Sequence, residues 1–281
     1  MASPFSAARL RRGGSFIRLT GVHPEVFDRR VKTLRSPWAA NQAKRVRSGR
    51  PLDTGRLEDH PIVMLVYDRC YITQAFLGYF YRVDKRAICR AIKRIEALAK
   101  PLFGVKRDPN LSREEASALI ADCTEQPIQR PGDDATHKDH YSGKKKRHTL
   151  KTEYLITKGR RIAAISPSHP RSRHDLTIRR AGPRVRKRTR LYGDSACQGC
   201  DKEHPTIDDP YKKPKNGELS AEDKAYNTGL SRLRVTVEHR IGRAKRFRIV
   251  SERYRNPRPT HATKTSIVAG LVNMNAGFAA C

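Results

Sequence analysis

Residues 118–122 read Ala-Leu-Ile-Ala-Asp, four apolar side chains followed directly by a carboxylate. A short apolar run bounded by polar residues is consistent with a buried strand. We therefore predict a strand over 118–121 that ends at Asp122. The polar stretch over 104–116 that precedes it predicts a hinge between this region and a different structural pattern upstream.

Apolar runs after this stretch predict three further strands. Residues 148–157 are rich in Thr, Tyr and Ile, which favour strands, residues 161–166 contain Ile-Ala-Ala-Ile, and residues 190–193 lead into a second acid. Helices are expected over 174–181 and over 223–248, where apolar residues recur at helical spacing. This order predicts an α/β or α+β fold, a mixed sheet flanked by helices.

The segment at 57–103 has helical periodicity instead. It predicts three short helices, over 62–70, 73–80 and 85–99, and Asp84 is a suitable N-cap for the third. Three short helices of which the last is apolar inside and basic outside are typical of a DNA-binding helix-turn-helix. The outer face of the third helix carries Lys85, Arg86, Arg90, Lys93 and Arg94.

An ordinary amphipathic bundle with a solvated charged face would explain the same three helices. Arg82 occupies the expected turn, where Gly would fit most easily. Upstream, we expect a short helix near 24–34 and a basic linker after it. The first fifteen residues predict a disordered basic arm, with an organellar transit peptide as the alternative.

These patterns divide the chain into three parts. Residues 1–54 are expected to form a basic arm and linker, residues 55–104 a helix-turn-helix domain, and residues 115–281 a third domain built on the mixed sheet. The composition agrees with a nucleic-acid partner, since 59 Lys and Arg face only 28 Asp and Glu, a formal charge of +31. Such a charge opposes compactness unless a polyanion neutralises it, which argues against an enzyme of small metabolites.

An anionic membrane is the other polyanion to consider. No apolar stretch approaches the ~18 residues of a membrane span, so we expect no membrane partner. The six Cys are scattered and do not form the pattern of a secreted disulfide scaffold. We therefore expect a cytoplasmic protein.

Three acids stand out in this basic chain. Asp122 and Asp194 follow predicted strands, and Glu238 lies in the last predicted helix. A carboxylate repels phosphate, and two like charges 4 Å apart repel by about 4 kcal/mol at an effective dielectric of 20. The acids become useful if they hold a divalent cation that the phosphate shares, and Mg²⁺ suits this role.

Cations accompany these acids. Arg234 and Lys245 lie within about 40° of Glu238 around the helix axis, so they would hold phosphates beside a metal; the plainer interpretation is an exposed Arg–Glu pair. A basic run precedes the second strand and would grip phosphates, or else it is a solvated charge run. Its residues are Lys144, Lys145, Lys146 and Arg147.

Other residues offer competing sites. Cys197 and Cys200 could form half of a zinc site with His137, His140 or His204, although structural zinc requires four ligands. The pair His174–Asp175 could replace Asp194 as the second acid. Glu125 lies three residues from Asp122 and so faces the other side of a strand, which favours a structural or loop role.

Long blocks of this sequence resemble the DDE transposases of bacterial insertion sequences in family five, over roughly residues 16–275. The blocks, in order, are RLTGVHPEVF (18–27), DCTEQPIQRP (122–131), YSGKKKRHTLKTEYLIT (141–157), RSRHD (171–175), YGDSACQG (192–199), KKPKNGELSAEDKAYN (212–227) and LSRLRVTVEHRIGRAKRFRIVSERYRN (230–256). The resemblance implies an RNase H-like core with a DDE triad that binds two Mg²⁺, for which Mn²⁺ would substitute. The matching acids are Asp122, Asp194 and Glu238.

The resemblance also implies partners and a reaction. Arg234 and Lys245 match the family's last helix, whereas Ser231 stands where Tyr is expected. The protein would bind terminal inverted repeats, hydrolyse phosphodiester bonds at the element ends and join the 3′-OH to target DNA. It would act as a homodimer or larger assembly on double-stranded DNA in the bacterial nucleoid. The alternatives are a transposase-derived DNA-binding protein without catalytic activity and a structural nucleic-acid-binding protein that needs no metal.

Overall fold

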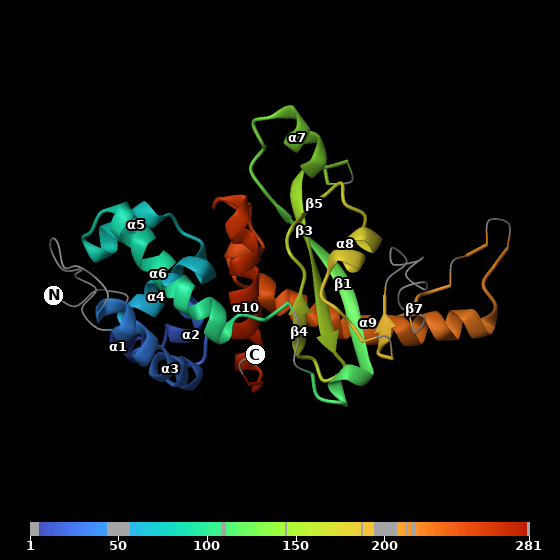
Figure 1. Ribbon diagram of the computed structural model, residues 1–281, viewed down its shortest axis with the longest axis horizontal. Coiled ribbons are helices and arrows are strands. Elements are labelled where there is room, and N and C mark those ends of the chain that lie inside the picture. The colour runs from blue at the N-terminus through green and yellow to red at the C-terminus, as the bar shows by residue number, and fades with distance from the viewer. Residues whose placement is uncertain are drawn as a thin grey trace.

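Two groups of elements, one helical and one built on a sheet, meet along a single buried helix. The computed structural model describes residues 6–43, 57–107, 111–143, 145–186, 188–193, 207–211, 213–214 and 217–279. The N-terminal helices lie at one end and the sheet at the other, with α10 (His261–Asn275) between them (Figure 1). None of the described helices is long and apolar enough to span a bilayer.

Helices begin almost at the start of the described chain. They are α1 (Ala7–Arg12), α2 (Phe16–Thr20) and α3 (Pro24–Ala43). Ser6 caps α1 by accepting from the backbone N–H of Arg9, and the side chains of Leu10 and Phe16 are buried. The expected disordered arm is therefore wrong for this region, because apolar residues spaced for packing outweigh its basic composition. The helix expected near 24–34 continues to Ala43.

Three further helices follow the expected pattern. They are α4 (Asp59–Cys70), α5 (Gln74–Tyr81) and α6 (Lys85–Phe103). Thr73 caps α5, and Asp84 caps α6 by accepting from the backbone N–H of Arg86 at 2.7 Å. Arg82 does adopt the left-handed conformation, with φ of 52°. The glycine that this junction requires is Gly78, since a Cβ there would lie 2.6 Å from the carbonyl oxygen of Val83.

Helix α10 ties the two ends together and was not expected from the sequence. It is buried on nearly every side, so it lacks the one-sided apolar stripe that identifies a surface helix. The Lys264 ammonium lies 2.7 Å from Asp68 of α4 and also pairs with Glu96 of α6. On the sheet side, the Asn273 amide bonds both backbone groups of Ile162.

The sheet is mixed, as expected. Strand β1 (Ala118–Pro127) runs antiparallel to β3 (Arg147–Thr157) and parallel to β6 (Arg190–Tyr192), which in turn runs parallel to β7 (Ile207–Asp208). Strand β4 (Ile162–Ile165) pairs with β3. The short strands β2 (Tyr141–Ser142) and β5 (His169–Pro170) also pair with β3.

Helices cover both faces of the sheet. The α9 helix (Ala221–Lys245) packs its Val237 and Ile241 side chains into the same core cluster as Ile120 of β1. The opposite face meets α8 (Asp175–Ala181), where Arg179 pairs with Glu153 of β3 at 2.7 Å. The remaining elements are α7 (Asp134–His140) and the 3₁₀ turns η1 (Glu115–Ser117), η2 (Arg248–Val250) and η3 (Arg258–Thr260).

Candidate active site

A cleft of about 500 Å³ opens where the later part of β1 faces the end of α9. It carries side chains of both signs, and we call it the carboxylate cleft. Its charged lining residues are Asp122, Glu125, Lys145, Lys151, Arg171, Asp175, Glu238 and Lys245. Residues more than a hundred positions apart in the chain therefore share one solvent-filled space.

Strand periodicity directs Asp122 toward α9. Its cross-strand neighbour is Tyr154, and both lie on the face of the sheet that carries Ile120. Glu238 lies on α9, exposed to the cleft, one turn before Gly242 and seven residues before Lys245. The structure thus brings together the first and third of the three acids singled out in the sequence.

Lys245 lies near both a positive and a negative side chain in this cleft. Burial and the nearby Lys145 ammonium lower the pKa of Lys245, while the Asp122 carboxylate opposes that shift. Lys245 nevertheless keeps solvent-exposed surface. A cation close to Asp122 but repelled by a second cation is well placed to bind an incoming anion.

Strand β6 ends next to this cleft. It pairs with residues 118–120 of β1 only, so among the described strands none covers that edge of β1 at Asp122. Gly193 follows β6, and its backbone N–H donates to the carbonyl oxygen of Asp208 at 3.1 Å. Asp194 lies outside the described residues.

The α8 side of the cleft is balanced by internal ion pairs. Glu125 forms an ion pair with Arg171 at 2.9 Å and lies 3.5 Å from the Lys145 ammonium. Lys151 pairs with Asp175 at 2.7 Å. Asp175, the alternative second acid, therefore lines the cleft but is engaged by a buried lysine.

The oxygen donors present suit a hard cation. Asp122 and Glu238 offer carboxylates only, the ligand type that Mg²⁺ and Mn²⁺ prefer. Within the described part of the chain, no group of three or more His, Cys, Asp or Glu is arranged to hold a metal ion. The donor set fits a divalent cation if another acid joins it.

The residues of the zinc hypothesis do not converge where the structure describes them. His137 packs its ring against His148 and Tyr141, and His140 Nδ1 lies 2.8 Å from the carbonyl oxygen of Thr136. The other three, Cys197, Cys200 and His204, lie outside the described residues.

The predicted DNA-binding residues divide into several groups. Lys145 and Lys245 line the carboxylate cleft, whereas Lys146, Arg147 and Arg234 are not among its lining residues. Lys144 lies outside the described residues. On α6 the side chains of Lys85, Arg86, Arg90 and Lys93 are exposed. Arg94 is half-buried, and its charge, together with burial, lowers the pKa of His60 to about 4.

One buried side chain that the sequence did not single out positions β1. Gln126 lies four residues after Asp122 on the same face, and its amide donates to the carbonyl oxygens of Ile249 and Glu252, both at 2.8 Å. Its Oε1 lies 2.7 Å from His261 Nε2. These bonds fix the end of β1 against the chain that follows α9, so they set how Asp122 faces Glu238.

His261 completes this anchor in its neutral form. Ser168 Oγ lies 2.6 Å from His261 Nδ1, and burial lowers the pKa of His261 to about 4. A neutral ring that donates from Nε2 to Gln126 can accept from Ser168 at Nδ1. The only sequence signal for this anchor was the presence of Gln126 four residues after Asp122.

Comparison with known proteins identifies the chain's relatives. The profile described as DDE superfamily endonuclease matches residues 121–273. A probable transposase for the insertion sequence element IS702 of Microchaete diplosiphon is 30% identical over 264 residues, which cover 92% of this chain and 93% of that protein. No solved structure matches the chain. The chain belongs to the DDE superfamily of endonucleases, among the transposases of insertion sequences.

Proposed function

We propose that the protein binds the terminal inverted repeats of its element, cleaves phosphodiester bonds there and joins the freed 3′-OH to target DNA. Asp122, Asp194 and Glu238 would hold two Mg²⁺ ions, or Mn²⁺ in their place. The observation that carries this proposal is the cleft that Asp122 and Glu238 share with Lys145 and Lys245. The reactive centre of a phosphoryl-transfer enzyme needs both signs of charge in one place.

The strand register supports the inclusion of Asp194. Leu119 pairs with Leu191, and Ile120 pairs with Tyr192, in the parallel ladder of β1 and β6. Strand β6 therefore points toward the end of β1 that carries Asp122, and Asp194 follows Tyr192 by two residues in the sequence. An RNase H-like core is the fold that we propose for this mixed sheet.

Each described side chain has a separate task in this proposal. Two ions bound by the acids would activate the attacking water or 3′-OH and stabilise the leaving oxygen. Asp122 and Glu238 supply the carboxylates, and Gln126 keeps them facing each other. Lys145 and Lys245 hold the phosphate groups beside the reacting bond, where their charges offset those of the DNA.

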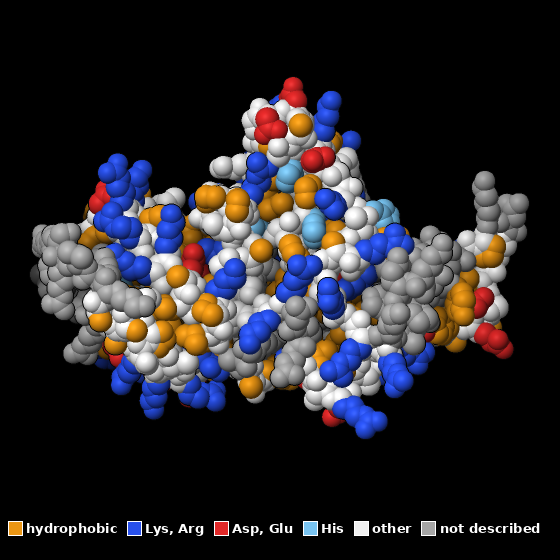
Figure 2. Space-filling view, in the orientation of Figure 1, with side chains coloured by type: hydrophobic (Ala, Val, Ile, Leu, Met, Phe, Trp, Pro, Cys, Tyr) orange, Lys and Arg blue, Asp and Glu red, His pale blue; other side chains and the backbone are white. Residues whose placement is uncertain are grey.

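DNA recognition would occur at the other end of the molecule. We propose that residues 55–104 form a helix-turn-helix domain, with α6 entering the major groove and Lys85, Arg86, Arg90 and Lys93 at the interface. Figure 2 shows Lys and Arg side chains spread from the helical bundle to the sheet, a surface that suits one long polyanion. Residues 115–281 would form the catalytic domain, and two copies would pair two DNA ends.

The test is cleavage of element-end duplex DNA with and without Mg²⁺. We expect Asp122→Asn to lower the cleavage rate by about 10³-fold or more while DNA affinity stays within a few-fold, since acids that share one metal site act as a unit. Glu222→Gln is the matched control, an exposed acid at the start of the same helix as Glu238.

Two results would count against the proposal. Cleavage by Asp122→Asn at the wild-type rate would remove Asp122 from the reaction. An absence of Mg²⁺-dependent cleavage by the wild-type chain, with DNA affinity intact, would favour a transposase-derived DNA-binding protein instead.

A further inference from the structure

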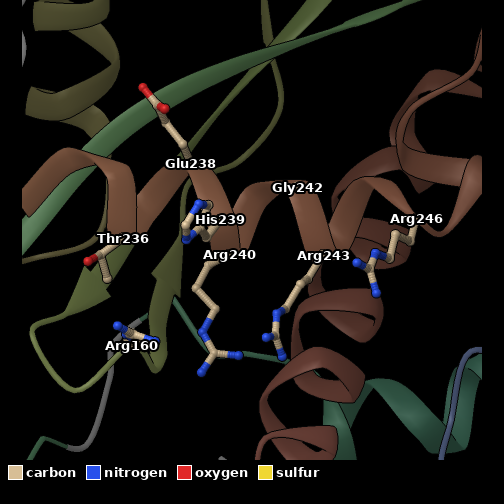
Figure 3. A pocket seen from close by; sticks show the side chains of 8 residues that line it. All are labelled: Arg160, Thr236, Glu238, His239, Arg240, Gly242, Arg243 and Arg246. Carbon is tan, nitrogen blue, oxygen red and sulfur yellow. The ribbon is translucent and has the colours of Figure 1, made fainter. Parts of the chain in front are cut away.

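A second cavity lies on the other side of α9, and half of its lining residues are arginines. We call it the arginine pocket; its volume is about 430 Å³, and its arginines are Arg160, Arg240, Arg243 and Arg246. Arg160 comes from the turn between β3 and β4, and the other three come from α9 and the residue after it. In Figure 3 the guanidinium groups of Arg160, Arg240 and Arg243 gather on the side of α9 away from Glu238.

Helical geometry separates this pocket from the proposed reaction site. Arg240 and Arg243 are two and five residues after Glu238, which places them about 160° and 140° around the helix from it. Glu238 is the only acidic residue among the described residues that line the pocket, and Figure 3 shows its carboxylate pointing away from the arginines. No carboxylate in the described lining therefore balances these charges.

Arg240 makes the absence of an acidic partner costly. Its residue surface is only 6% exposed, its guanidinium lies 5.6 Å from the centroid of the Phe278 ring, and Nη1 is buried without a hydrogen bond to any described atom. Burial, and then the charges of Arg243 and Arg160, lower the pKa of Arg240, yet a guanidinium remains charged in proteins. A buried charge without an acidic partner normally requires a counter-ion.

We propose that Arg160, Arg240 and Arg243 form a binding site for a phosphodiester group of DNA that is not the one being cleaved. Three features match this ligand. Planar guanidinium groups bind phosphate oxygens in pairs, Thr236 adds a hydroxyl to the lining, and Gly242 leaves open space where a side chain would project.

This assignment rests on the proposed function only for the source of the phosphate. One helix would then serve two phosphates of the DNA: Glu238 on one face belongs to the reacting group, and the arginines on the opposite face hold a second position. The arginine pocket would thereby fix the angle at which DNA crosses α9.

The test measures DNA affinity as a function of salt, in EDTA so that no cleavage occurs. The variant is Arg160→Asn with Arg243→Gln, because both side chains are exposed and Asn tolerates the positive φ of residue 160. The control is Arg232→Gln with Arg253→Gln, which removes the same charge from exposed residues outside both cavities. Melting temperatures check that both proteins fold.

We expect the pocket variant to bind duplex DNA about tenfold more weakly at 0.15 M salt, with a shallower slope of log K against log salt by about 0.9. A loss seen only with element-end duplex assigns the phosphate to the element. A loss seen also, or only, with an unrelated duplex assigns it to target DNA.

An affinity and a salt slope equal to those of the control variant, on both duplexes, would overturn the site. Because this experiment needs neither metal nor cleavage, it can fail while Asp122→Asn still abolishes cleavage, and the reverse is also possible.

Discussion

The two cavities on either side of α9 differ in how their positive charges are balanced. In the carboxylate cleft, Glu125 pairs with Arg171 and Asp175 pairs with Lys151. In the arginine pocket, no described acid points toward the guanidinium groups. The contrast matches the two proposed roles: a site for metal and phosphate together would keep both signs of charge, whereas a site for phosphate alone would keep only one.

The interior of the protein follows the balanced pattern. Lys264 is 3% exposed and lies against Asp68 and Glu96, and Arg179 is 2% exposed and pairs with Glu153. Burial raises the pKa of Glu153 to about 7, and Arg179 opposes that shift. Arg240 is the exception, because no described acid pairs with it. The effect of replacing Arg240 on the free energy of unfolding therefore distinguishes a structural role from a ligand-binding one.

The largest expected loss of stability comes from removing one member of a buried ion pair. Lys264→Met leaves Asp68 and Glu96 without their cation at the junction of α4, α6 and α10. We expect the free energy of unfolding to fall by about 3–5 kcal/mol, measured by urea denaturation. A loss below about 1 kcal/mol would show that this buried pair does not hold the two ends of the molecule together.

Acidification should destabilise the protein, because protonation of His261 would place a positive charge in the interior. The folded pKa of His261 is about 4, below the unfolded value of about 6.5, so its contribution is complete above pH 6.5 and is lost as the pH falls toward 4. We expect about 3 kcal/mol from His261 over that range, and His60 shifts in the same direction.

Urea titrations at several pH values check this expectation. The His261→Gln variant should lose less stability on acidification than the wild type does. His23→Gln, at an exposed position, should behave as the wild type. Identical acid profiles for all three proteins would contradict the role of the buried ring.

The smallest expected stability change is at Arg240. Arg240→Met keeps much of the side-chain volume, including its packing near Phe278, and removes a buried charge that no described acid balances. We therefore expect the free energy of unfolding in the absence of DNA to stay within about 1 kcal/mol of the wild type or to rise. Urea denaturation without DNA, as for Lys264→Met, measures this change. A loss of about 3 kcal/mol here would mean that Arg240 has a structural partner.

Much of the architecture could be predicted because local signals marked it. Thr73 and Asp84 are good caps, and Leu230 to Ala244 repeat at helical spacing. The apolar run at 118–121 begins a strand as predicted, although the strand continues past Asp122 to Pro127. Helix α10 could not be predicted in this way because burial on all sides removes the periodic contrast. Helices α1 and α2 and the second half of α3 were missed because basic residues mask a few well-spaced apolar ones.

The candidate site was likewise predicted only in part. Asp122 and Glu238 stood out as acids in a basic chain, and the structure places both on one cleft. Gln126 and His261 were missed because their pairing joins residues 135 positions apart. The arginine pocket was missed because Arg160 and Arg240 meet only through the packing of the β3–β4 turn against α9.

The central claim is that three acids act as one metal site, and a combination of variants tests it most directly. Cleavage of element-end duplex in Mn²⁺ is measured for Asp122→Asn, Asp194→Asn, Glu238→Gln and the triple variant, at DNA concentrations that saturate each protein. We expect each single change to cost about 10³-fold or more and the triple change to cost little beyond one of them, since residues that act as a unit are not additive. Wild-type cleavage by Asp194→Asn, or losses that multiply from one variant to the next, would contradict it.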